Sequence, residues 1–143
     1  MKTRYSPLVH VKKNIMQKSE RVLQSANAKL YSAQTALQLS FNSLNDIVTP
    51  QSGLMPEFLA SRTLLDAGRT LIKHNEEWVA FTQEEISEAT LQLRLDTIEF
   101  EKYKYLETQE IKKILKKMKL QEAKDLDEVA LMTYKNLNKS ETL

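Results

Sequence analysis

The fold is decided by the stretch LVHVKKNIMQKSERVLQSANAKLYSAQTALQLSFNSLNDIV, residues 8–48. Its apolar residues recur at steps of four and three, which brings their side chains to one face of an α-helix. The pattern repeats every eleven residues, close to the period of a straight helix. We therefore predict one long helix whose narrow apolar stripe needs a partner helix. The stripe consists of Leu8, Val11, Ile15, Ser19, Val22, Ala26, Leu30, Ala33, Leu37, Phe41, Leu44 and Val48.

The bounds of this helix follow from the residues that flank it. Ser6 is suited to the N-cap and Pro7 to the first helical position. Pro50 and Gly53 break the pattern at the other end. We predict a helix over about 6–48, a bend over about 49–56 and a second helix over about 57–138. Because Gly68 disfavours a helix interior, the sequence leaves open whether 56–67 is a separate short helix or the first turns of the long one.

The composition indicates an all-α chain. Both glycines and all three prolines lie at or before residue 68, whereas a sheet protein of this length would need many more turns. We predict a single domain over residues 1–143, an all-α, long antiparallel two-helix coiled-coil hairpin with unequal helices. Small residues in the first helix, such as Ala26 and Ala33, permit close approach of its partner. The second helix is the longer one, so residues 107–138 have no intramolecular partner in this arrangement.

Several classes of function are disfavoured. The chain has no cysteine, and its two histidines, His10 and His74, do not have metal-ligand spacing. Carboxylates are abundant, but a two-helix hairpin offers no cleft that would shift their pKa values. We expect no enzyme activity, no cofactor and no metal site. No stretch approaches the roughly 20 apolar residues of a membrane span, and the start of the chain does not read as a signal peptide, so we expect a cytoplasmic protein.

Charge is distributed unevenly although the net charge is only +2. Residues 1–29 and 111–143 are basic and the middle is acidic, so a hairpin would gather the basic segments toward one end. The densest run, Lys112–Lys119, is amphipathic on a helix. Such a helix can bind membrane, nucleic acid or an acidic protein surface, or it can be the solvated flank of a coil. Nucleic acid is disfavoured because the protein as a whole is hardly basic.

Apolar residues around the bend exceed what one seam requires. Leu64, Leu65, Leu71, Ile72 and Trp78 cover more than one helical face. Exposed apolar side chains of this kind predict a docking site. The alternative is packing against a short helix over 56–67, which fits Leu64 and Leu65 better than Trp78.

Two motifs resemble those of a known family. The start, Tyr5–Ser6–Pro7–Leu8–Val9–His10–Val11–Lys12–Lys13, is similar to the aromatic-x-x-Leu-x-x-Val opening of the flagellar FliJ family. The run from Tyr105–Leu106–Glu107 to Asp127–Glu128–Val129–Ala130 is similar to the C-terminal pattern of that family. The chain length and the two unequal helices also resemble it.

The resemblance implies a non-enzymatic coiled-coil stalk of the flagellar type III export apparatus. Its expected partners are the export ATPase, the export gate membrane protein and export chaperones. Its expected location is the cytoplasm, peripheral at the inner face of the cell membrane. A self-associating structural coiled coil unrelated to secretion is the alternative. The ATPase end would comprise Arg4, Lys12, Lys13, Lys112, Lys113, Lys116 and Lys117, and the hairpin tip Phe41, Leu44, Leu71, Ile72 and Trp78.

Overall fold

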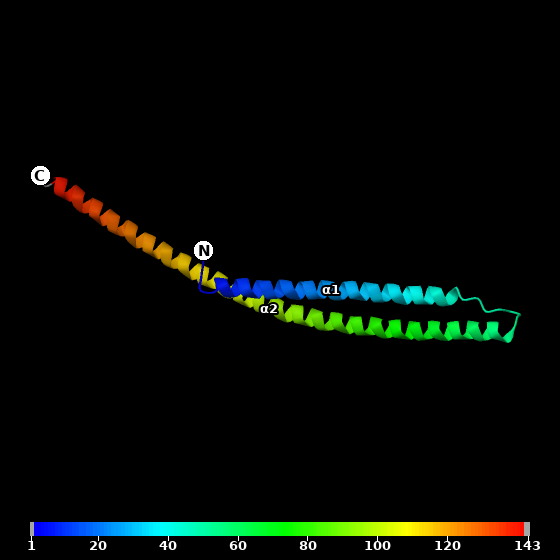
Figure 1. Ribbon diagram of the computed structural model, residues 1–143. Helices are drawn as coiled ribbons and strands as arrows, with labels where there is room; N and C mark the ends of the chain where they lie inside the picture. The colour runs from blue at the N-terminus through cyan, green and yellow to red at the C-terminus, as the bar shows by residue number, and fades with distance from the viewer. Residues whose placement is uncertain (1, 142–143) are drawn as a thin grey trace. The chain divides into compact units, whose positions relative to one another are not determined.

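A computed structural model describes residues 2–141 and confirms the predicted all-α hairpin. It contains helix α1 over Ser6–Asn45 and helix α2 over Met55–Glu141, joined by residues 46–54 (Figure 1). The chain divides into two compact units, residues 1–13 with 99–143 and residues 14–98. Within the second unit the two helices lie side by side and antiparallel. No helix within the described residues is long and apolar enough to cross a membrane.

The first turn of α1 is capped by Thr3. The Thr3 side chain accepts a hydrogen bond from the Tyr5 amide at 3.2 Å, and the Ser6 side chain accepts one from the Thr3 amide at 2.9 Å. This reciprocal pair satisfies amide groups that have no partner within the helix. Ser6 is therefore the first helical residue and not the N-cap that the sequence predicted.

A backbone hydrogen bond forms a tight turn at each end of the connection between the helices. The Ile47 amide bonds back to the Leu44 carbonyl at 3.2 Å, which closes α1 three residues before the predicted Val48. Gly53 has a φ of +150°, a conformation that side chains strongly disfavour. The Glu57 amide then bonds to the Leu54 carbonyl at 3.0 Å as α2 begins. From there α2 continues without a break through Gly68.

In the second unit the buried positions of α1 repeat every seven residues. They are small side chains, namely Ser19, Ala26, Ala33 and Ser40. The predicted eleven-residue stripe is therefore wrong in part: Ser19, Ala26, Leu30, Ala33, Leu37 and Leu44 are buried or half-buried as predicted. Other members are not, since Val22 is 52% exposed, Phe41 40% and Val48 84%. The physical reason is that a seven-residue step, and not an eleven-residue one, keeps one side of a helix against a coiled-coil partner. Larger half-buried residues alternate with the small ones, namely Met16, Leu23, Leu30, Leu37 and Leu44.

Helix α2 presents a matching set of small seam residues. They are Ser61, Gly68, Asn75, Thr82 and Ala89, again seven residues apart. The larger residues between them are Leu65, Ile72, Val79, Ile86 and Leu93. We refer to these alternating positions of both helices as the seam. Layers of small side chains thus alternate with layers of larger ones, so the helices can approach closely at every small layer.

Asn75 and Ser19 make hydrogen bonds across the seam of this unit. The Asn75 amide donates to the hydroxyl of Ser40 and, at 3.3 Å, to the carbonyl of Ala36. Toward the other end of the unit, the Ser19 hydroxyl donates to the Asp96 carboxylate. Buried polar pairs of this kind are satisfied in one alignment only. They therefore specify the antiparallel register of α1 and α2.

In the first unit, half-buried residues of α2 continue at the same three- and four-residue steps, namely Phe100, Tyr103, Glu107, Glu110 and Ile114. We count them as part of the seam, which ends at Ile114. Before it, Lys12 lies 3.8 Å from Glu99 and its ammonium is 5.7 Å from the Tyr103 ring centroid, and Arg4 lies 4.0 Å from Glu110. Every described residue from 115 to 140 is exposed. Beyond Ile114, the positions of α2 that continue the seven-residue repeat of the seam hold polar residues, namely Lys117, Gln121, Lys124 and Glu128.

Candidate interaction surfaces

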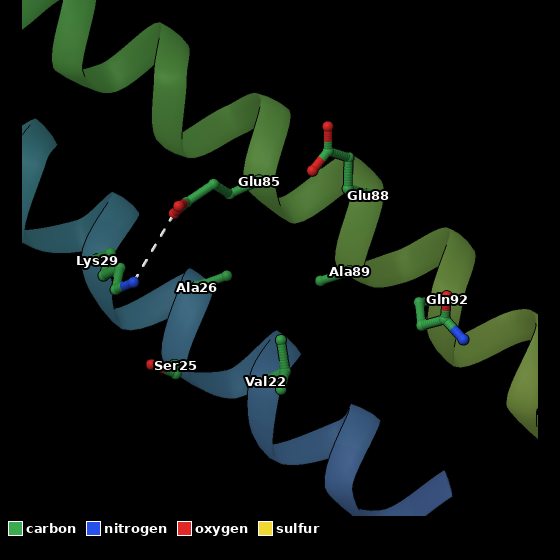
Figure 2. Close-up of a pocket in the computed structure, with 8 residues that line it drawn as sticks. All are labelled: Val22, Ser25, Ala26, Lys29, Glu85, Glu88, Ala89 and Gln92. Carbon is green, nitrogen blue, oxygen red and sulfur yellow. Dashed lines mark ion pairs between the residues drawn. The ribbon is translucent and has the colours of Figure 1, made fainter. Parts of the chain in front are cut away.

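A groove beside the seam of the second unit follows from its small residues. Ala26 and Ala89 face each other across the two helices, as Figure 2 shows, and their methyl groups leave a groove of about 550 Å³. Lys29 and Glu85 form an ion pair at its edge, 4.0 Å apart. The residues that line the groove include one lysine and two glutamates but no histidine. Within residues 2–141 there is no cluster of three or more His, Cys, Asp or Glu that could hold a metal ion.

All seven residues predicted for the ATPase end lie in the first unit. Lys112, Lys113, Lys116 and Lys117 are exposed, and together with Lys119 they form what we call the basic segment. Among the described residues, no carboxylate lies within ion-pair distance of these lysines. Their charge is therefore available to a partner.

The remaining three basic residues are in different surroundings. Arg4 and Lys12 are engaged with Glu110 and Glu99, and the Lys12 side chain is only 29% exposed. Lys13 is exposed. An exposed ion pair is weak and is easily exchanged for another partner, so Arg4 remains a candidate contact. Lys12 contributes first to packing in its own unit.

Four of the five residues predicted for the hairpin tip fall into two groups. Ile72 is 8% exposed and Leu44 half-buried, because both are seam residues that hold α1 against α2. Leu71 and Trp78 are 50% and 37% exposed. A partner can reach this second pair without opening the hairpin.

Leu71 and Trp78 continue a row that begins with Leu64, seven residues earlier, and we call these three residues the apolar flank. The next position in the row is Glu85, which reaches Lys29 across the seam. Phe41 follows Ser40 directly along α1. It therefore flanks the seam residues of α1 on the side away from the apolar flank. The structure therefore does not bring Phe41 together with the apolar flank.

Exposed apolar side chains also surround the connection between the helices. Sequence reasoning had not singled them out, because it assigned Val48 to the α1 stripe and Leu54 and Met55 to the bend. In the structure the exposed fractions are 84% for Val48, 73% for Leu54 and 70% for Met55. Their dense spacing next to Pro50 and Pro56 was the available signal, since a proline on either side leaves little regular structure to cover them.

Comparison with known proteins identifies the chain. A family model described as FliJ, flagellar FliJ protein, matches residues 1–139. The chain belongs to the FliJ family. FliJ proteins are non-catalytic components of the flagellar protein export apparatus. The comparisons with curated proteins and with solved structures found no match. The FliJ match covers α1, the connection and nearly all of α2, so it includes both the basic segment and the apolar flank.

Proposed function

We propose that this FliJ-family chain is a coiled-coil stalk that links the flagellar export ATPase ring to the export gate and assists export chaperones. In this proposal it acts in the cytoplasm, at the inner face of the cell membrane. The observation that supports the proposal most is the basic segment, in which lysines without ion pairs surround an exposed part of α2. Unpaired positive charge of this kind favours and accelerates association with an acidic partner surface.

In the proposal the basic segment binds the ATPase. The test is a pull-down with the cognate export ATPase, using the wild-type chain and the variant Lys112→Glu, Lys113→Glu, Lys116→Glu, Lys117→Glu. We expect loss of most binding, and a weaker wild-type interaction at high salt because exposed charges are screened. A matched control reverses the exposed residues Lys18, Arg21, Arg62 and Lys73, which lie in the other unit.

Equal binding by the wild-type chain and the basic-segment variant would contradict this role of the segment. So would an equal loss of binding in the control variant, since binding would then depend only on net charge. Circular dichroism of each variant checks that the helices are retained. All four lysines are exposed, so their replacement leaves the seam intact.

The apolar flank is the surface that we assign to the export gate. Leu71 and Trp78 combine exposed apolar area with a large aromatic ring, the type of residue that dominates many interfaces. We expect Leu71→Glu and Trp78→Glu to abolish capture by the cytoplasmic part of the gate and to leave ATPase binding unchanged. Leu39→Glu is the control, because Leu39 is 59% exposed and lies on the other helix. Undiminished capture by both flank variants would refute this assignment.

A further inference from the structure

The exposed part of α2 carries an apolar stripe that nothing among the described residues covers. Leu115, Met118, Leu126 and Val129 lie within about 80° of one another around the axis of a helix with 3.6 residues per turn. Their exposed fractions range from 44% at Leu115 to 70% at Leu126. We call these four residues the C-terminal stripe. An apolar stripe on one side of a helix is suited to packing against other helices.

Two charged residues lie half-way along the C-terminal stripe. Lys119 follows Leu115 by four residues, and Glu122 precedes Leu126 by four. Around the helix, Glu122 lies about 60° from Lys119, toward the side that carries Asp125. A surface that covers this stripe therefore has to offer apolar contacts at both ends. Between them it needs an acidic group for Lys119 beside a basic group for Glu122.

The second unit presents such a surface on one side of its seam. At the centre of this surface Lys29 and Glu85 pair across the two helices (Figure 2), with side chains 59% and 32% exposed. Trp78, seven residues before Glu85, lies on the same side of α2 and is 37% exposed. Phe81, seven residues before the groove residue Glu88, is 59% exposed. Beyond the ion pair lies the groove of about 550 Å³, and we call this whole side the groove face.

The C-terminal stripe and the groove face match in their spacing. With two parallel helices offset by about 35 residues, Leu115 is level with residue 80 of the other α2, between Trp78 and Phe81. The same offset sets Leu126 level with residue 91, within the groove. Apolar side chains of the stripe then meet exposed aromatic rings at one end and the groove at the other. The charged residues at the centre of each surface lie level with one another.

The charges fix the direction of the second helix. A right-handed helix that lies on the groove face parallel to α2 turns Lys119 toward α2 and Glu122 toward α1. Lys119 then lies beside Glu85, and Glu122 lies beside Lys29. In the opposite direction each of these residues would meet one of its own charge, which is unfavourable.

We propose that the C-terminal stripe of one copy of the chain packs on the groove face of another copy, with its helix parallel to the α2 that it covers. The two contacting surfaces are different, so each copy in such a pair keeps one of its two surfaces free. Further copies can add in the same way, and the assembly grows as an open chain. This proposal does not rest on the proposed function, although the assembly would cover Trp78 and part of the basic segment.

The test is sedimentation of the purified full chain from submicromolar to high micromolar concentration, without ATPase or gate. We expect reversible association that continues beyond the dimer as the concentration rises. A stripe variant, Leu126→Glu with Val129→Glu, and a groove variant, Val22→Glu with Phe81→Glu, replace exposed residues. Each variant alone should associate at least about tenfold more weakly than the wild-type chain, because the contact would bury two carboxylates against apolar surface.

Mixing the two variants in equal amounts distinguishes this contact from a symmetric dimer. The stripe variant keeps an intact groove face, and the groove variant keeps an intact stripe. We therefore expect a one-to-one heterodimer that does not grow at higher concentration. A wild-type chain that stays monomeric, or a mixture that stays monomeric, would overturn the proposal. Binding of the monomeric chain to phosphatidylglycerol vesicles would then assign the stripe to an anionic membrane instead.

Exchange of charges tests the direction of the helices. Lys119→Glu and Glu85→Lys should each weaken the association at least about threefold, and the two combined in one chain should restore it. The control combines Lys119→Glu with Glu76→Lys, at an exposed position on the other side of the seam, and should restore nothing. Circular dichroism checks that every variant keeps its helices. Failure of Glu85→Lys to restore the association of the Lys119→Glu chain would overturn the parallel arrangement.

Discussion

The side-chain amide of Asn75 on α2 donates to the hydroxyl of Ser40 on α1, and these two residues are only 6% and 4% exposed. Displacing one helix by seven residues would place Asn75 opposite Ala33 or Ile47, neither of which has a side chain that can accept this hydrogen bond. A buried amide without a partner is costly. This pair therefore favours one register among those that the repeat of the seam allows.

The first prediction concerns this pair. Asn75→Ala should lower the free energy of unfolding by about 1–3 kcal/mol, because two hydrogen bonds across the seam are lost and a small cavity remains. Ser40 keeps its bond to the Ala36 carbonyl at 2.8 Å, so no buried hydroxyl is left without a partner. Urea denaturation followed by circular dichroism measures the change.

Asn42→Ala is the matched control for this measurement. Asn42 is exposed and accepts only from Gln38 on the same helix, at 3.1 Å. We expect its replacement to alter the free energy of unfolding by less than about 0.5 kcal/mol. Equal effects of the two substitutions would show that the Asn75 contact does not stabilise the hairpin.

The second prediction concerns the size of the seam residues. Ala33 is fully buried, and its position seven residues before Ser40 places it opposite Thr82, which is 1% exposed. Ala33→Leu should destabilise the hairpin by about 1–3 kcal/mol, because the helices must separate to admit the larger side chain. Ala28→Leu changes an exposed position of the same helix and should be nearly neutral. A stabilising Ala33→Leu substitution would contradict close approach at this layer.

The third prediction uses Gly68 and Leu44. A Cβ atom at Gly68 would lie 2.8 Å from Leu44 Cδ1, so Leu44 has to move when the glycine is replaced. Replacing glycine by alanine inside a helix normally contributes about 1 kcal/mol of stability. We expect Gly68→Ala to give clearly less than this in the wild-type chain and the full gain in a Leu44→Ala background. A double-mutant cycle measures the coupling, and strict additivity would disprove the contact.

The fourth prediction concerns the exposed part of α2. Trp78 is the only tryptophan and lies directly beside the seam of the second unit, on the apolar flank, so its fluorescence reports on the hairpin. Removing residues 121–143 should leave the thermal midpoint of the Trp78 signal unchanged at submicromolar concentration, because residues 121–140 are all exposed. Truncation after Leu95 should lower the midpoint, since it removes Asp96, the partner of Ser19. A lower midpoint after removal of residues 121–143 would reveal contacts that the structure does not contain.

The hairpin could be predicted from the sequence because its determinants are local. Pro50 and Gly53 separate two regions of helical periodicity, and nothing after Gly68 breaks the second one. The seven-residue repeat of the seam could not be told from an eleven-residue repeat in the sequence, because both consist of steps of three and four residues. Phe41 stands beside Ser40, and a search for apolar residues chooses the phenylalanine although the serine is buried. Burial in a closely packed seam follows side-chain size more than hydrophobicity.

The surface residues were harder to predict for the same reason. Leu71 and Ile72 are neighbours of similar hydrophobicity, and only the register decides that Ile72 is buried and Leu71 exposed. The exposure of the lysines of the basic segment, by contrast, could be predicted without the register, because this part of α2 has no neighbouring helix. Their surroundings agree with the length difference between the two predicted helices.

The end of the seam at Ile114 has a consequence for how this chain can vary. Before that point, an insertion or deletion in one helix displaces every later side chain relative to the seam, unless α1 and α2 change together by whole multiples of seven. After it, no intramolecular partner constrains the length of α2, so residues can be gained or lost one at a time. Natural relatives should accordingly differ in size mainly at their C-terminal ends, and engineered fusions should be tolerated there first.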